Sequence, residues 1–290
     1  MIKFIEKHDN VFSLILIILS IYGVTIDVIL ENADELWNFQ NVYKMYNGFQ
    51  IYNDINVIVT PLFFWIGKLL LTILGANLLT FRIYNIIIMA IIYFLTYLLL
   101  KKLKINKKVA MIIVLLLILL KGYCLVLSQA NYNSMALMLC ILGVLFYLNQ
   151  YKHHSIIQGV LLFLIFITKQ NIGVFYAIGL FFSEIITITN RKEKIKNIII
   201  ESSVFLTFLI LMLTYFYHTK TLYNFVNYTV LGIQEFANEN MFINISNLIL
   251  SVFFVIINLV LTKIFIKNNK VNLEQKKQLV VLNCFSIPLI

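Results

Sequence analysis

The residues best suited to chemistry stand in one polar stretch, residues 31–61. It carries four carboxylates, at Glu31, Asp34, Glu35 and Asp54. The whole chain has only 13 Asp and Glu against 23 Lys and Arg, so an acidic cluster is unusual for it. Asn32 followed three residues later by Glu35 resembles a capping box, which predicts a helix start. The helix dipole keeps a carboxylate in the first turn ionised and able to accept a proton, so Asp34 is the candidate general base.

The four carboxylates also have purely structural explanations. An acidic residue in the first turn stabilises any helix, which would account for Asp34 without catalysis. Glu31 and Glu35 fit capping and surface roles. Asp54 is a candidate ligand-binding residue, but Tyr52-Asn53-Asp54 is equally a surface turn.

The composition is that of a multispanning membrane protein. Of the 290 residues, 61% are hydrophobic and 12% are charged, and the mean hydropathy is +0.91. A soluble core does not need that much apolar surface. Long apolar runs without polar alternation favour spanning helices over a barrel, so we expect an all-α fold. The net charge of +10 comes from short Lys clusters between the runs, as in cytoplasmic membrane anchors, and does not indicate a nucleic-acid partner.

The lengths of the apolar runs predict about eight complete spans and the start of a ninth, all in one domain, residues 1–290. Single runs of spanning length cover residues 11–30, 83–100, 198–217 and 245–266. Two longer runs, 109–148 and 156–188, must each fold back once, the first within residues 121–134 and the second at residues 168–171. The chain stops thirteen residues into the ninth span, so we expect a C-terminal truncation.

The distribution of Lys and Arg predicts which loops face the cytoplasm. With the N-terminus inside, 17 of the 23 fall in cytoplasmic segments and six at the outer side. Residues 31–82 then form a first outer loop, the predicted catalytic loop, and residues 218–244 a second. The apolar stretch 61–75 must not cross, and at about 20 Å as a helix it is predicted to lie in the interface. An amphipathic helix precedes it, with one face made of Leu36, Phe39, Tyr43 and Tyr46.

Two cations at predicted outer helix ends, Arg82 and Lys169, are suited to binding a phosphate. Arginine offers a bidentate fork and lysine a point charge. Lys169 interrupts an apolar run beside Gln170 and Asn171, polar groups that would be costly at that depth without a partner or a cavity. The alternative is that both cations simply extend to the membrane surface.

Several features occur in a recognisable order. After a first helix, Asp34-Glu35 opens an aromatic amphipathic helix, Gly48 is followed by Tyr52 and Asp54, and a Pro-led apolar stretch precedes Arg82 at the start of the next span. Other short segments fit too: Gly75-Ala76-Asn77, Asn131-Tyr132-Asn133 and Thr168-Lys169-Gln170-Asn171. Over essentially the whole chain, this order resembles the GT-C class of polytopic glycosyltransferases, in particular the bacterial protein O-mannosyltransferase-like and lipid A aminoarabinose transferase-like branch.

The resemblance implies transfer of a sugar from a polyprenyl-phosphate donor to a glycan, lipid or protein acceptor, at the outer face of the cytoplasmic membrane. It also implies an acidic residue of the first outer loop as base, a role that falls on Asp34 and secondarily on Glu35. A phosphate leaves as an anion, so the reaction needs a base and cations but no strong general acid, unlike glycoside hydrolysis. Attack from the opposite face would invert the anomeric centre. The predicted substrate-binding residues are Asp54, Arg82, Tyr132, Asn133, Lys169 and Gln170.

The chain departs from the family pattern in one place. Many relatives carry a second acidic residue between the third and fourth spans, where this chain offers Gln129, Asn131 and Asn133. A two-acid or metal-assisted mechanism therefore has no support in the sequence, and we expect no cofactor. The histidines do not form a site of their own, because the pair His153-His154 and His218 are predicted on opposite sides of the membrane. Three aromatic residues are suited to stacking on a sugar: Trp37, Trp65 and Tyr132. Anchoring at the membrane interface is the commoner role of such residues.

The alternative function is a polytopic transporter or flippase for lipid-linked sugars or other envelope precursors. Such proteins show internal repeats and charged or broken helices near the middle of the membrane. The polar residues of this chain are predicted to gather at the outer surface instead, which favours the enzyme.

Overall fold

The computed structural model describes residues 33–119, 131–232 and 273–286, and isolated positions within 11–18 and 249–264. Over these residues the chain is helical apart from turns, loops and one isolated bridge between Ile51 and Ile55, which confirms the all-α prediction. It divides into two compact units. Unit 1 comprises Met1–Gln50 and Pro61–Leu145, and unit 2 comprises Ile51–Thr60 and Phe146–Ile290.

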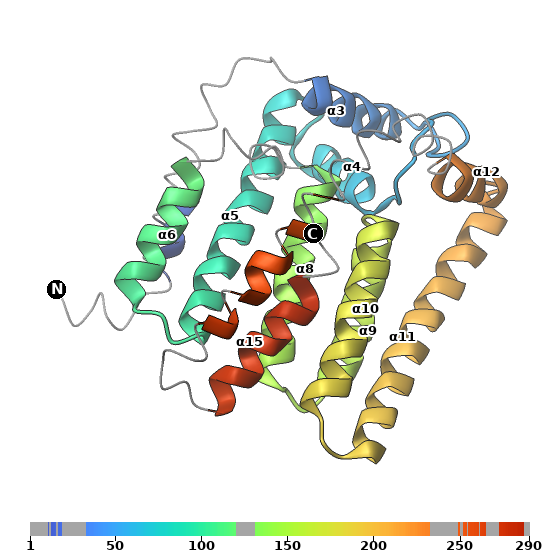
Figure 1. Ribbon diagram of the computed structural model, residues 1–290. Helices are drawn as coiled ribbons and strands as arrows, with labels where there is room; N and C mark the ends of the chain where they lie inside the picture. The colour runs from blue at the N-terminus through green and yellow to red at the C-terminus, as the bar shows by residue number, and fades with distance from the viewer. Residues whose placement is uncertain are drawn as a thin grey trace. The chain divides into compact units, whose positions relative to one another are not determined.

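Unit 1 contains the predicted amphipathic helix, α3 (Ala33–Tyr46), packed against α4 (Leu62–Leu74) (Figure 1). Leu36, Tyr43 and Tyr46 of its apolar face are exposed, as a helix lying on a membrane surface would require. The opposite face is buried, and it consists of Asn38, Asn41, Val42 and Met45. The helix thus packs through a partly polar face and leaves its aromatic face outward.

The close approach of α3 to α4 depends on Gly67. A Cβ atom added there would lie 2.9 Å from Cγ2 of Val42, closer than two carbon atoms pack. The chain leaves α3 through Gly48, whose φ of +94° a side chain would disfavour. The Gly48 N–H donates to the carbonyl oxygen of Met45 at 3.2 Å, which ends the helix where the sequence predicts.

Three further helices belong wholly or partly to unit 1: α5 (Leu78–Lys102), α6 (Lys107–Leu119) and α8 (Tyr132–Asn149). The Asn77 side chain caps α5 by accepting the Thr80 N–H at 2.9 Å. The Tyr84 hydroxyl donates to the carbonyl of Phe63 at 3.1 Å and so joins α5 to α4. Figure 1 shows α6 running beside α5 after a short turn.

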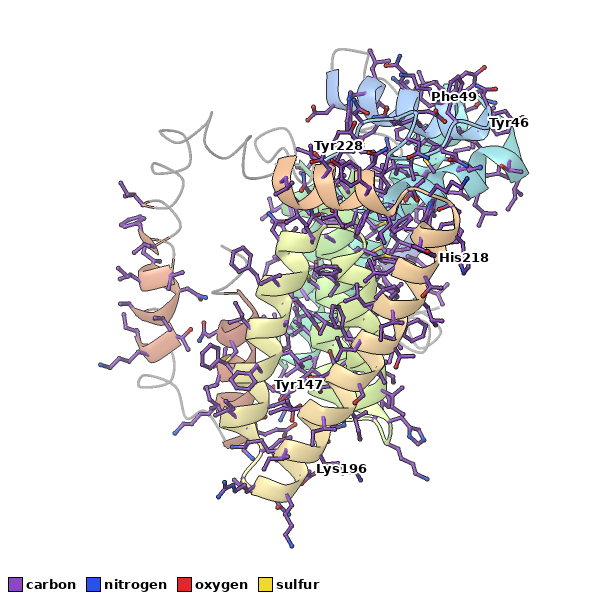
Figure 2. All side chains as sticks on the ribbon, turned by 90° about the vertical axis from the view of Figure 1, so that its right-hand side faces the viewer. Tyr46, Phe49, Tyr147, Lys196, His218 and Tyr228 are labelled. Carbon is purple, nitrogen blue, oxygen red and sulfur yellow. The ribbon has the colours of Figure 1, made fainter. Side chains whose placement is uncertain are left out.

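Unit 2 is built around three neighbouring helices, α9 (His154–Phe166), α10 (Gln170–Thr187) and α11 (Arg191–His218). The predicted break at residues 168–171 is confirmed as the turn between α9 and α10. A short helix, α12 (Leu222–Val226), and a π-helix, η2 (Asn227–Leu231), follow α11, and α15 (Leu273–Ser286) packs on α10. Figure 2 shows Tyr147 toward the Lys196 end of α11, and Tyr228 toward the His218 end.

The number of spans differs from the sequence prediction. Four described helices, α5, α8, α10 and α11, are long and apolar enough to cross a membrane, so eight complete spans and the start of a ninth are not confirmed. Helices α6 and α9 have 13 residues each, about 20 Å against a hydrocarbon core of about 30 Å. The predicted spans 11–30 and 245–266 lie largely outside the described residues. Helix α4, also 13 residues long, agrees with the prediction that residues 61–75 do not cross.

The contact between α9 and α11 is tightest at Gly159. An added Cβ would lie 2.8 Å from the carbonyl oxygen of Glu201 and 2.8 Å from Cβ of Val204. We therefore expect Gly159→Ala to lower the free energy of unfolding by about 1–3 kcal/mol, because neither the backbone nor a Cβ atom can move aside cheaply. Thermal unfolding in detergent measures this.

Gly232→Ala is the matched control for that substitution. Its added Cβ would have no neighbour closer than 3.6 Å, so we expect a change within about 0.5 kcal/mol. Equal unfolding temperatures for the two variants would contradict the tight α9–α11 contact.

Candidate functional site

Four of the predicted site residues come together in unit 1, each near the N-terminal end of a helix. Asp34 and Glu35 lie in the first turn of α3, Arg82 lies in the second turn of α5, and Tyr132 is the first residue of α8. Arg82 Nε lies 3.4 Å from Oε1 of Glu35. Asp34 is close enough to Tyr132 for its charge to act on the phenol group. We call these four residues the α3 cluster.

The two carboxylates of the α3 cluster differ in their surroundings. Glu35 is largely buried, with 11% of its side chain exposed, and its ion pair holds Arg82 in place. Asp34 is exposed, and its backbone carbonyl accepts a hydrogen bond from Nδ2 of Asn38 at 2.9 Å. Glu35 is therefore suited to positioning the guanidinium group, and Asp34 is the carboxylate that an incoming hydroxyl group can approach.

A row of polar side chains continues along α3 from Asp34. Asn38 and Asn41 follow at helical spacing and are 2% and 5% exposed. Oδ1 of Asn38 and Nδ2 of Asn41 have no hydrogen-bond partner among the described residues, although buried amide groups are normally paired. The row therefore leaves an acceptor and a donor unpaired in the buried face of α3. It was not predicted from the sequence, where the aromatic face of this helix gives the stronger pattern.

Aromatic rings contribute to the same region. The Tyr132 ring lies edge-on to Phe63, with 6.5 Å between ring centroids. Trp37 meets Phe64 in the same way at 6.1 Å and remains partly exposed. Two of the three predicted sugar-stacking residues, Trp37 and Tyr132, thus pack on phenylalanines of α4, and the third, Trp65, belongs to α4 itself.

The polar residues predicted at the start of α8 serve mainly to cap it. Oδ1 of Asn131 accepts the backbone N–H groups of Asn133 and Ser134, at 2.8 Å and 3.1 Å. Asn131 is therefore a structural residue, and Asn133 lies partly buried in the first turn. Gln129 falls outside the described residues.

The remaining predicted site residues belong to unit 2, where Gln170 has a structural role. Its Nε2 donates to the carbonyl oxygens of Ile58, at 3.0 Å, and Thr229, at 2.8 Å. The Thr60 hydroxyl donates to the carbonyl of Phe166 at 2.8 Å. The turn between α9 and α10 is thereby joined to residues 51–60 and to η2, and the amide nitrogen of Gln170 is committed to the fold.

Asp54 lies exposed in a tight turn closed by a 2.9 Å hydrogen bond from the Tyr52 N–H to the Ile55 carbonyl. Tyr52 has a φ of +71°, an uncommon conformation for a bulky residue. Its buried hydroxyl donates to the Val59 carbonyl at 2.9 Å, and burial holds the pKa of Tyr52 well above its ordinary value. The surface-turn interpretation of Asp54 therefore matches its geometry.

Lys169 occupies the N-cap position of α10 and is partly buried. Burial lowers the pKa of Lys169 below its ordinary value, because leaving water disfavours the charged ammonium group. A cation beside the free N–H groups of a helix start favours an anionic ligand.

Comparison with known proteins adds no assignment. No protein-family model, no curated protein and no solved structure matches this chain.

The lowered pKa of Lys169 predicts a stability effect with a defined sign. Since folding disfavours the protonated amine, we expect Lys169→Met to raise the unfolding temperature at pH 7. The stability of the unsubstituted protein should increase as pH rises through the window between the lowered pKa and the unfolded value of about 10.4, so the advantage of the variant shrinks there. Thermal unfolding in detergent from pH 7 to 10 measures this. Lys192→Met, at an exposed lysine, should show no such trend, and a pH-independent advantage of Lys169→Met would contradict the assignment.

Proposed function

We propose that this protein is a membrane glycosyltransferase that moves a sugar from a polyprenyl-phosphate donor to a glycan, lipid or protein acceptor. The α3 cluster is the observation that supports this proposal most directly. It combines an exposed carboxylate, a cation held by an ion pair and an aromatic ring, at Asp34, Arg82 and Tyr132. These are the groups that the reaction needs as base, phosphate partner and sugar platform.

The helix ends strengthen the case for a phosphate. The starts of α3, α5 and α8 each carry the positive end of a helix dipole, although Asn77 and Asn131 already accept N–H groups of α5 and α8. The ion pair of Glu35 with Arg82 and the charge interaction of Asp34 with Tyr132 indicate that these three helix starts share one neighbourhood. Three positive helix ends and one guanidinium group would stabilise the charge on a departing phosphate.

The reaction then proceeds by direct displacement. The acceptor hydroxyl gives its proton to Asp34 and forms a bond to the anomeric carbon, while the bond from that carbon to the phosphate oxygen breaks. The electron pair of that bond leaves with the polyprenyl phosphate, next to Arg82. The configuration at the anomeric carbon inverts.

The surroundings of the α3 cluster suit a lipid-linked donor. Helix α4 is apolar apart from Lys68 and Thr72, and Leu69, Ile73 and Leu74 on it are exposed. A polyprenyl chain can lie along such a surface while its phosphate reaches Arg82. The Lys and Arg distribution favours an outer position for this region, at the cytoplasmic membrane.

One observation favours a second candidate, a transporter or flippase for lipid-linked sugars. Glu184 and Glu201 are buried within α10 and α11, two helices of spanning length. The sequence argument against a transporter assumed that polar residues gather at the outer surface, and these two carboxylates remove that assumption. Charged residues within spanning helices commonly mark transport pathways.

Asp34→Asn separates the two functions. With the full-length protein in proteoliposomes and a panel of synthetic polyprenyl-phosphate hexoses and pentoses, we expect release of polyprenyl phosphate to fall about 10²–10⁴-fold, because the amide cannot accept the proton. Glu193→Gln, at an exposed acid in the first turn of α11, should retain the rate of the unsubstituted protein.

The same proteoliposomes also test the transporter alternative. Transfer that is unaffected in a well-folded Asp34→Asn protein would remove the base assignment. Movement of intact donor across the bilayer without any release of polyprenyl phosphate would identify a transporter.

A further inference from the structure

We propose that unit 2 binds one divalent transition-metal ion, best fitted by Zn²⁺, through His154, Glu184 and Glu201. His154 is the first residue of α9, Glu184 lies in the last turn of α10, and Glu201 lies in the interior of α11. One donor atom from each lies within 4.8 Å of the other two. The site is independent of the α3 cluster, which belongs to unit 1.

Both carboxylates are buried and incompletely paired. Glu184 is 0% exposed and Glu201 is 4% exposed. Oε1 of each has no hydrogen-bond partner within the described part of the chain. Burying one ionised carboxylate without a counter-charge is costly, and two side by side repel each other as well. A cation at the point where these oxygen atoms converge would remove both costs, as would protonation of the carboxyl groups.

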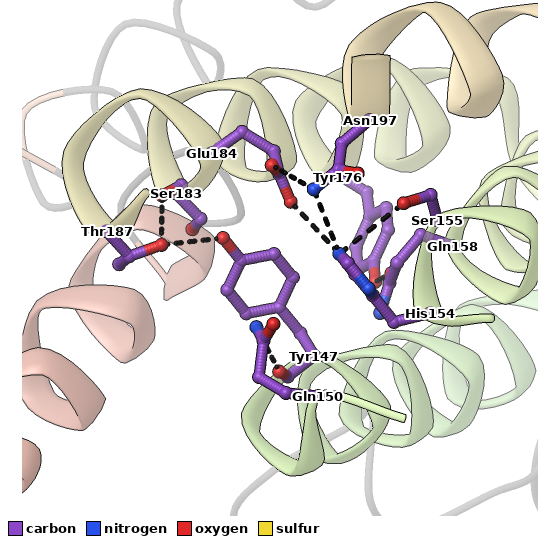
Figure 3. Close-up of polar contacts among 10 residues, drawn as sticks. All are labelled: Tyr147, Gln150, His154, Ser155, Gln158, Tyr176, Ser183, Glu184, Thr187 and Asn197. Atoms are coloured by element: carbon purple, nitrogen blue, oxygen red, sulfur yellow. Dashed lines mark hydrogen bonds and ion pairs between the residues drawn. The ribbon is translucent and has the colours of Figure 1, made fainter. Parts of the chain in front are cut away.

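The imidazole ring of His154 presents a lone pair to the same point. Its Nε2 lies 3.2 Å from Nδ2 of Asn197 and 3.7 Å from Oε1 of Glu184, and the same Asn197 nitrogen donates to Oε2 of Glu184 at 3.1 Å (Figure 3). An amide N–H group donates and never accepts, so in this contact the lone pair of Nε2 accepts the Asn197 N–H group and the ring proton is on Nδ1. This neutral imidazole is the form that binds metal ions, and an ion bound at Nε2 would take the place of the Asn197 hydrogen bond.

The type and spacing of the donor atoms indicate which metal ion the site would bind. Donor atoms around a tetrahedral zinc ion, at bond lengths of about 2.0–2.2 Å, lie about 3.4 Å apart, and the spacing of His154 Nε2 to Glu184 Oε1 is close to that. One imidazole and two carboxylates suit Zn²⁺, and a divalent ion matches their two negative charges. Mg²⁺ and Ca²⁺ prefer all-oxygen sites. Asn197 would orient Glu184 as a supporting residue outside the ligand set.

Tyr147 lies between this metal site and a neighbouring pocket. Its ring lies edge-on to His154, with 6.4 Å between centroids, and its hydroxyl is 2.9 Å from the hydroxyl of Thr187. Tyr147 and Thr187 also line a pocket of about 350 Å³, together with Gln150, Glu274 and Gln278. An ion in this pocket would be separated from His154 by the Tyr147 ring.

Metal content tests the proposal directly. The purified full-length protein, equilibrated with Zn²⁺ or with Mn²⁺ and then dialysed, should retain about one zinc ion per chain and less manganese, as measured by elemental mass spectrometry. His154→Gln and Glu201→Gln should lose the ion, and Asn197→Ala should weaken binding about 10–100-fold. X-ray absorption at the zinc edge should show one imidazole nitrogen together with oxygen ligands.

Two neighbouring residues serve as matched controls, because His153 and Glu193 are exposed. His153→Gln and Glu193→Gln should keep the zinc ion. A chelator should lower the unfolding temperature of the unsubstituted protein but leave that of Glu201→Gln unchanged, which separates loss of metal from misfolding. A well-folded protein that retains no metal would overturn the proposal and assign protons to the two carboxylates, and zinc retained equally by Glu201→Gln would overturn it as well.

Discussion

The ion pair between Glu35 and Arg82 is the contact on which the proposed active site depends. It joins the start of α3 to the start of α5, so that Asp34, Arg82 and Tyr132 belong to one neighbourhood. The pair restricts the guanidinium group, which ends a long flexible side chain, to the start of α3. The pair is only partly exposed, which protects it from screening by salt better than a surface pair. The two adjacent carboxylates of α3 thereby have different roles, one structural and one available for chemistry.

In unit 2, too, the pairing of buried polar groups decides what their side chains can do. Its polar atoms lie between apolar helices, where hydrogen bonds within the protein must replace those to water. The amide nitrogen of Gln170 meets this requirement with the carbonyls of Ile58 and Thr229, whereas its Oε1 has no partner among the described residues. Glu184 and Glu201 meet it only in part. The carboxylates differ from Gln170 in carrying charge and in lying within reach of each other and of His154, which is the physical ground for assigning a bound cation there.

Much of the helical architecture could be predicted from the sequence, because polar breaks in apolar runs mark helix ends. The turn at residues 168–171, the short helix after Pro61 and the stop at Gly48 were all predicted in this way. Periodicity shows which residues share a face of a helix but not which face packs. The buried face of α3 therefore turned out to contain Asn38 and Asn41, and the aromatic face is the exposed one.

The contacts that could not be predicted join residues far apart in the chain. The ion pair of Glu35 with Arg82 and the hydrogen bonds of Gln170 span long sequence separations that no local pattern reveals. The predicted number of spans is not confirmed, and among the described residues α6 and α9, with 13 residues each, are short for a crossing. Glu184 and Glu201 were overlooked although their signal was present: a carboxylate within an apolar run suggests a functional site.

Photocrosslinking with a polyprenyl phosphate that carries a photoreactive group near its phosphate tests the central claim most directly. Peptide mapping of the labelled full-length protein locates the phosphate on the chain. We expect the label on the first turns of α3 and α5, near Asp34 and Arg82, with competition by unlabelled polyprenyl phosphate. Label confined to unit 2, in the last turns of α10 or along α11, would contradict the account and favour a transporter.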